Sequence, residues 1–137
     1  MFRIEPKPYG FKVITEGALT EVEVLRLKAE LLDKITSLGC TFSLLLDSRK
    51  MVVPTPDVLE VFTQLHTAIW KLPCERVAFI LESPVSHRRA VQMHYSSAPG
   101  SHDRFINALQ YPDWEARAEA WIVNAVEPES TRSSKSK

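Results

Sequence analysis

The sequence predicts an α/β sandwich, in which a mainly parallel central sheet carries an antiparallel hairpin at its N-terminal edge and about four helices. Apolar runs at residues 41–46 and 76–81 are too short for helices and are typical of strands covered on both faces. Segments with helical apolar spacing precede, separate and follow these runs. Strands that alternate with helices in this way indicate parallel pairing, because each helix returns the chain to the edge where the previous strand began.

The first forty residues predict the edge hairpin and one helix. Residues 2–5 and 11–15 each alternate between apolar and polar side chains, and the segment between them, PKPYG, is rich in turn-forming residues. Thr20 and Glu23 then form a capping box, and apolar residues recur at helical spacing until Gly39. The recurring residues are Val24, Leu27, Leu31, Ile35 and Leu38.

Two further helices are expected in the middle of the chain. One lies between the two apolar runs and is bounded by Pro56 and Pro73. Its predicted core face consists of Val58, Val61, Phe62, Leu65, Ala68, Ile69 and Leu72. The other starts at Ser83, a candidate N-cap followed by Pro84, and continues to Ala98.

The C-terminal part predicts a short strand, a last helix and a tail. Residues 104–107 suit the strand, and Trp114 and Trp121 are expected to anchor the helix to the sheet. The final segment, EPESTRSSKSK, contains no apolar residue, so we expect residues 127–137 to be a disordered polar tail. Residues 1–126 then form a single domain.

Composition excludes several classes of protein. A chain of 137 residues with 45% hydrophobic content can bury one core without metals or disulfides. Positive and negative side chains number 17 each, so no excess charge suggests a nucleic-acid partner. No apolar run approaches the roughly 20 residues that a spanning helix needs, and no signal peptide is recognisable. We therefore expect a cytoplasmic protein that does not insert into membranes.

The two cysteines are expected to be reduced. Cys40 and Cys74 each precede an apolar run and have no CxxC spacing or histidine-rich neighbourhood. Reduced thiols that pack in the interior are therefore the predicted state, with a disulfide between them as the alternative.

In this order of elements the chain resembles the STAS superfamily, the fold of SpoIIAA-like anti-sigma-factor antagonists. The resemblance extends from residue 1 to about residue 125 and is carried by LLLDSRKMVVPTPDVLEVF, ERVAFILESPVSHRRAVQMH and RFINALQYPDWEARAEAWI. The last two stretches are similar to its small stand-alone branch of unknown function. The resemblance implies a STAS/SpoIIAA-like sandwich and a regulatory module.

The resemblance also directs attention to Thr55. Phosphorylatable members carry a serine at the start of the helix after the leucine-rich strand, within an Asp-Ser-Ser-Gly type motif, and a partner kinase modifies it. Thr55 is the nearest position here, but Pro54, Pro56 and Asp57 replace the motif. Thr55 is thus a candidate phospho-acceptor, and a phosphate there would be stabilised by the helix N-terminus. Capping by its hydroxyl explains the Thr-Pro pair without phosphorylation.

A ligand pocket is predicted near Asp47. This residue follows the leucine run where a parallel strand is expected to end, and ligand sites in open α/β sheets form beyond the carboxyl ends of strands. Glu82 is expected at the same edge. His94 lies on the predicted inner face of the third helix, so with Tyr95 it could line this pocket. An enzyme or metal-binding protein that uses Asp47 and His94 is one alternative function.

No metal or other cofactor is expected. His87 and His94 lie about 10 Å apart along the expected helix axis, too far for a compact metal site. A Ser-His-Asp set built with Ser83 or Ser86 lacks the glycines of a nucleophile elbow. The 4 glycines are not clustered, so no loop that cradles phosphate is predicted.

Leu59, His66 and Trp70 form a stripe beside the core face of the second helix. The stripe either packs against a neighbouring helix or serves as a homodimer patch anchored by Trp70. Together these observations predict a non-enzymatic regulatory or ligand-binding module. It would act as a homodimer through contacts with a protein partner or a small apolar ligand. The alternatives are the rim-site enzyme or metal protein and a switch phosphorylated at Thr55.

Overall fold

The computed structural model describes residues 1–82 and 102–128. A five-stranded sheet has the order β1-β2-β3-β4-β5. β1 and β2 are antiparallel and the other neighbouring pairs are parallel. The strands are β1 (Phe2–Lys7), β2 (Gly10–Gly17), β3 (Phe42–Met51), β4 (Cys74–Leu81) and β5 (Asp103–Asn107). The predicted mainly parallel sheet with an antiparallel N-terminal edge is therefore confirmed.

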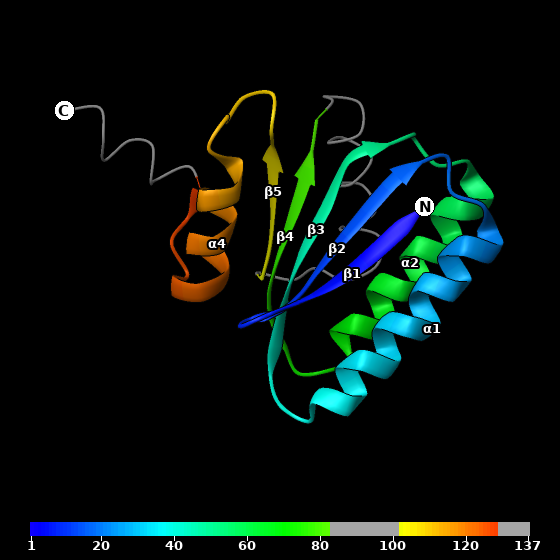
Figure 1. Cartoon of the computed structure of the whole chain (residues 1–137), viewed down its shortest axis with the longest axis horizontal. Coiled ribbons are helices and arrows are strands. Elements are labelled where there is room, and N and C mark those ends of the chain that lie inside the picture. The colour runs from blue at the N-terminus through cyan, green and yellow to red at the C-terminus, as the bar shows by residue number, and fades with distance from the viewer. Residues whose placement is uncertain (83–101, 129–137) are drawn as a thin grey trace.

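Helices cover both faces of the sheet (Figure 1). α1 (Glu21–Leu38) and α2 (Pro56–Trp70) lie side by side on one face, and α4 (Trp114–Asn124) covers the other. The helix predicted from Ser83 to Ala98 lies outside the described residues, so three of about four expected helices are seen. No helix in the described ranges has the length and apolar character needed to cross a membrane.

The start of α1 follows the predicted capping box. The Glu23 backbone N–H donates to the Thr20 hydroxyl over 3.1 Å, and the Thr20 backbone N–H donates to the Glu23 carboxylate over 3.0 Å. The bond from the Thr20 backbone lowers the pKa of Glu23. Gly39 ends the helix with a φ of 71°, a left-handed conformation that glycine adopts without strain.

The side chains of β3 alternate between two cores. Phe42 and Leu44 face α1 and α2, whereas Leu45 faces α4. The first core contains Phe11, Val13, Leu27, Leu31, Ile35, Phe42, Leu44, Leu65, Ile69, Val77 and Phe79. The second contains Leu45, Ala78, Ile80, Ile106, Tyr111, Ala118, Trp121 and Ile122. The continuous apolar run of β3 is explained because both of its faces are buried.

β3 is longer than the sequence predicted. The strand continues to Met51, so the prediction that Asp47 lies at the end of the strand is wrong. Asp47 is paired with Ile14 and Ile80 inside the sheet. The polar residues after Asp47 stay in the strand because β2 offers backbone partners as far as Gly17.

The C-terminal helix is held by its tryptophans and by the chain that follows. Trp121 is buried, and its indole N–H lies 3.2 Å from the carbonyl oxygen of Val77, which confirms its anchoring role. Arg104 forms two 2.7 Å hydrogen bonds with the Glu127 carboxylate, and Arg117 donates to the carbonyl of Pro128. The first two residues of the predicted disordered tail are thus attached to the domain, and residues 129–137 lie outside the described part.

Both cysteines are free thiols. Cys74 is half-buried, and burial together with Asp103 and Glu75 raises its pKa to about 12. Cys40 is exposed, so the prediction that it packs in the interior is wrong. It follows Gly39, where the chain has left the helix and has not yet entered β3.

Candidate functional site

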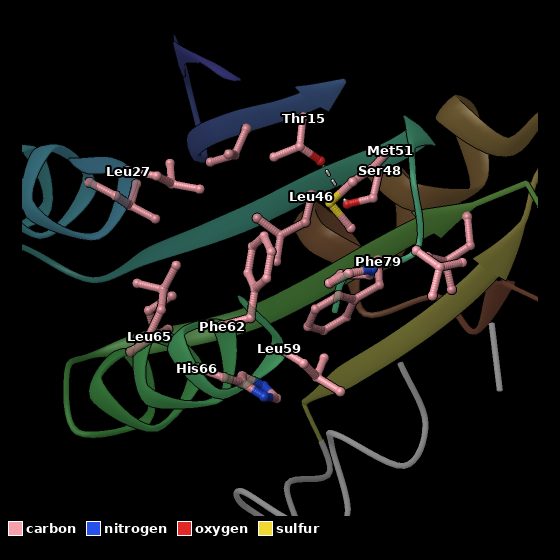
Figure 2. A pocket seen from close by; sticks show the side chains of 16 residues that line it. Thr15, Leu27, Leu46, Ser48, Met51, Leu59, Phe62, Leu65, His66 and Phe79 are labelled. Carbon is pink, nitrogen blue, oxygen red and sulfur yellow. Dashed lines mark hydrogen bonds between the residues drawn. The ribbon is translucent and has the colours of Figure 1, made fainter. Parts of the chain in front are cut away.

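A cavity of about 100 Å³ lies between the sheet and helices α1 and α2 (Figure 2). Figure 2 shows side chains that point into a common space from both helices and from the strands. The lining residues in the described part of the chain are Val13, Thr15, Leu27, Leu31, Leu46, Ser48, Met51, Val53, Pro54, Leu59, Phe62, Leu65, His66, Ile69, Phe79 and Leu81. Nearly all of these side chains are apolar.

Aromatic rings form one wall of the cavity. The Phe79 ring stacks on Phe105 with centroids 4.7 Å apart, and the His66 ring meets Phe79 edge-on at 5.5 Å. Such arrangements match the preferred geometries of aromatic pairs. The rings therefore hold one another in place, and this wall has a defined shape.

Two hydroxyl groups interrupt the apolar lining. Thr15 is buried, and its hydroxyl lies 3.1 Å from the hydroxyl of Ser48, as the dashed line in Figure 2 marks. The strand pairing is irregular here: Ile14 pairs with Asp47 and Glu16 pairs with Lys50. Thr15 thus faces two residues of β3, as in a β-bulge, and bulges recur beside functional sites.

The bulge also changes which β3 side chains reach the cavity. Ser48 and Met51 both line it, although they are three residues apart and a regular strand would turn them to opposite faces. The extra residue in β3 shifts the alternation by one and returns Met51 to the cavity side.

His66 forms the polar end of the lining contributed by α2. It is 5% exposed, and its Nε2 atom lies 3.0 Å from both the Asp103 carboxylate and the indole nitrogen of Trp70. The indole can only donate and the carboxylate accepts. A protonated Nε2 therefore donates to Asp103, whereas an unprotonated Nε2 accepts from Trp70. In the first case His66 joins α2 to the first residue of β5, and in the second it accepts from Trp70 within α2.

The predicted Asp47 pocket is not the cavity found here. Asp47 lies on the α4 face, where its carboxylate binds the Arg49 guanidinium at 2.9 and 3.1 Å. The bond from Asp47 raises the pKa of Arg49, whose guanidinium lies 4.4 Å from the Trp114 ring centre. His94 and Tyr95, the other residues of the predicted pocket, lie outside the described residues. Asp47 in this arrangement serves as the partner of Arg49.

Thr55 occupies the N-cap position of α2 without capping it. Its backbone is extended, with φ −69° and ψ 163°, and its carbonyl accepts the first helical hydrogen bond from Leu59. The hydroxyl forms no capping bond, so the prediction of a side-chain cap is wrong. Proline at the first helical position lacks a donor, and the hydroxyl of exposed Thr55 accepts from none of the remaining helix donors.

The stripe on α2 is largely used inside the domain. His66 is buried, Leu59 lines the cavity, and the Trp70 ring lies 5.3 Å from the ring of His102. These contacts favour intramolecular packing of the stripe. Trp70 remains half-buried. The homodimer therefore stays a prediction, and Trp70 is the residue of the stripe that could still anchor it.

Metal-ligating side chains do not gather in the part of the chain that is described. Within residues 1–82 and 102–128, no group of three or more His, Cys, Asp or Glu side chains could hold a metal ion. Ser83, Ser86 and His87 lie outside these ranges.

Thr15 and Ser48 were not singled out by the sequence. The available signal was weak: each is a hydroxyl residue on the inward side of a strand that is otherwise apolar there. Their meeting depends on the register between β2 and β3 and on the bulge, which no local pattern specifies.

Comparison with solved structures shows the fold. The chain is similar to an uncharacterized protein of the DUF3478 family with a SpoIIAA-like fold from Shewanella loihica PV-4. The two share 15% sequence identity, the alignment covers 89% of this chain and 92% of that protein, and the TM-score is 0.63. The sequence matches no protein-family model and no curated protein. The chain therefore has the SpoIIAA-like fold that its order of elements predicted.

Proposed function

We propose that this protein is a non-enzymatic module that binds a small apolar molecule in the cavity between the sheet and helices α1 and α2. The observation that carries this proposal is a space of about 100 Å³ whose lining, in the part of the chain that the structure describes, is nearly all apolar. Cavities of about 150 Å³ with aliphatic and aromatic walls bind benzene or xenon, so this space suits a molecule with one small ring.

Energetics support a ligand. Protein interiors are packed as densely as organic crystals, so apolar side chains that border unfilled space lose packing contacts, and this loss costs stability. Larger side chains at Val13 or Val53 would remove much of that cost. A bound apolar molecule would supply the packing contacts that the side chains around the unfilled space lack.

The contacts of His66, in the cavity lining, and of Asp47, outside it, support binding rather than catalysis. His66 is buried, with Asp103 and Trp70 each 3.0 Å from its Nε2 atom and therefore able to bind one or the other tautomer. Asp47 lies on the other face of the sheet and is occupied by Arg49. These contacts give each group a structural role.

Titration with cyclopentane tests the proposal. Backbone amide shifts of the lining residues should change in a saturable manner when nuclear magnetic resonance spectra of the full chain are recorded. Leu59→Trp fills the cavity from α2 and should abolish the changes. Leu25→Trp is the matched control, because Leu25 is 45% exposed on α1. No saturable change in the native protein, or equal changes in both variants, would contradict the proposal.

A second candidate function is a phosphorylation switch at Thr55. The exposed hydroxyl, free of a capping bond, supports this proposal because an acceptor must be accessible. Val53 and Pro54, just before it, line the cavity, so an added charge would lie close to the ligand. Incubation of the chain with a Thr-Pro-directed kinase, followed by mass spectrometry, should add phosphate at Thr55. Phosphate elsewhere only, or unchanged incorporation in Thr55→Val, would refute the switch.

We also propose a homodimer in which Trp70 is the anchor. Its half-buried ring beside His102 is the supporting observation, because large rings at the centre of an interface contribute most to binding. Sedimentation at micromolar concentration should show a dimer that Trp70→Ala converts to monomer. The control is Val22→Ala, at an exposed position of α1, which should leave the dimer intact. A monomeric native chain would rule out the dimer.

A further inference from the structure

The hydroxyl groups of Thr15 and Ser48 bear on the chemistry of the ligand. They lie 3.1 Å apart and share one hydrogen bond. Two hydroxyls carry two hydrogens, so one hydrogen remains whichever of the two donates. Neither hydroxyl makes another hydrogen bond within residues 1–82 and 102–128. The pair thus presents one hydrogen-bond donor at the cavity wall.

The surroundings make this donor unusual. Thr15 is 4% exposed and Ser48 is half-buried, and the other cavity residues include Leu46, Met51 and Phe79, whose side chains offer no strong acceptor. A donor that no protein acceptor meets is rarer in proteins than an acceptor with a spare lone pair. A ligand with an acceptor atom at this wall would accept a hydrogen bond from the remaining hydrogen of the Thr15–Ser48 pair.

The charge of the lining residues limits which acceptor group a ligand could carry. No lysine or arginine is among the lining residues that the structure describes. A carboxylate or phosphate there would meet no lysine or arginine of the described lining, and burial of an unpaired ion is costly. A neutral oxygen accepts a hydrogen bond from Ser48 without that cost. The space left around it is apolar and suits a hydrocarbon body against Phe62 and Phe79.

We propose that the ligand is a small neutral carbonyl compound whose oxygen accepts a hydrogen bond from Ser48. Its hydrocarbon part fills the space between the sheet and α2. This inference rests on the proposed function, because it concerns the same cavity. It adds the polar group by which the cavity selects its ligand from apolar molecules of equal size.

Two probes of nearly equal shape separate the inference from the function. Cyclopentanone has the acceptor oxygen, and methylenecyclopentane replaces that oxygen with a CH₂ group. Dissociation constants of both are measured by titration of the full chain and of Ser48→Ala. The substitution should weaken cyclopentanone binding by about five- to tenfold, the value of one hydrogen bond, and leave methylenecyclopentane binding within about twofold. Comparison of each probe with itself removes the different hydration of the two molecules.

Each outcome has one meaning. Selective loss of cyclopentanone binding in Ser48→Ala supports the inference. If both probes bind the native chain and the substitution changes both equally or neither, the inference is overturned while the proposed function stands. If neither probe binds the native chain, the proposed function fails and the inference fails with it.

A spectroscopic measurement on the native chain covers the case in which Ser48→Ala does not fold. The infrared carbonyl stretch of ¹³C-labelled bound cyclopentanone should lie at lower frequency than in hexane, because hydrogen bonding weakens the C=O bond. Thr15→Val preserves side-chain shape and leaves Ser48 to donate, so the lowered frequency should persist in that variant. A bound frequency equal to that in hexane would overturn the inference.

Discussion

The hydroxyl oxygens of Thr15 and Ser48 lie 3.1 Å apart in the cavity wall, where Thr15 of β2 faces two residues of β3. The contact joins two parallel strands through side chains at a place where regular backbone pairing is interrupted. It therefore stabilises the irregular register and at the same time places polar atoms beside apolar side chains.

This contact should be measurable as an energetic coupling. Thr15→Val and Ser48→Ala each remove one partner, and each should lower the free energy of unfolding by about 1 kcal/mol. The double variant should lose less than the sum, with a coupling of about 0.5–1 kcal/mol in urea denaturation. Strict additivity would show that the two hydroxyls do not interact in the folded protein.

The two N-cap threonines should differ in their effect on stability. Thr20→Ala removes the hydroxyl that accepts from the Glu23 N–H, so it should cost about 1 kcal/mol. Thr55→Ala removes a hydroxyl that makes no capping bond and should change stability by less than about 0.5 kcal/mol. Both residues have an extended backbone, so each is the control for the other. Equal losses in chemical denaturation would contradict the uncapped start of α2.

Gly10 should not tolerate a side chain. A Cβ atom there would lie 2.2 Å from the carbonyl oxygen of Ser43, and φ is +146°. Gly10→Ala should therefore cost at least about 2 kcal/mol of unfolding free energy, because backbone atoms on β3 would have to move. Gly39→Ala should cost about 1 kcal/mol, since a Cβ there meets nothing within 4 Å and only the left-handed φ of 71° is unfavourable. A smaller loss for Gly10→Ala than for Gly39→Ala would contradict the register of β2 and β3.

The two thiols should react at different rates. Cys40 is exposed, whereas the pKa of Cys74 is raised to about 12 by burial and by Asp103 and Glu75, so little of its reactive thiolate forms at pH 8. Iodoacetamide should modify Cys40 first and Cys74 only after unfolding, as mass spectrometry of the native chain and of Cys40→Ser can show. Rapid modification of native Cys40→Ser would contradict the burial of Cys74.

The raised pKa of Cys74 also determines how the free energy of unfolding changes with pH. A raised folded-state pKa means that the folded protein holds the thiol proton more tightly than the unfolded chain does. The stability contributed by neutral Cys74 is fully present below its ordinary pKa of 9.0 and is lost as pH rises toward about 12. Cys74→Ala should show a smaller fall in unfolding free energy over this range.

Local signals predicted most of the fold. The box formed by Thr20 and Glu23 fixes the start of α1, and Gly39 fixes its end, because these groups satisfy the backbone within a few residues of themselves. The apolar run of β3 was recognisable because the strand is covered on both faces. Such features depend on neighbours in sequence or on burial alone.

Features that depend on distant partners were missed. The second half of β3, after Asp47, reads as a loop because its residues are polar, yet β2 extends beside it and Arg49 covers Trp114. His66 was predicted in a stripe that packs against a helix or forms a dimer patch, whereas it is buried with its Nε2 atom 3.0 Å from Asp103 at the start of β5. The cavity is a place where side chains from five elements do not fill the interior. Its presence depends on the combined shapes of these side chains, so no periodic pattern in the sequence predicts it.

A crystal structure of the protein under xenon pressure can show whether the space between the sheet and helices α1 and α2 admits an apolar ligand. Xenon is apolar and enters cavities that can hold an apolar ligand. We expect xenon density between Leu46, Phe62 and Phe79, in the space that Figure 2 shows. Xenon on the surface alone, with side chains filling this space, would contradict the claim that the SpoIIAA-like fold of this chain holds a ligand-binding cavity.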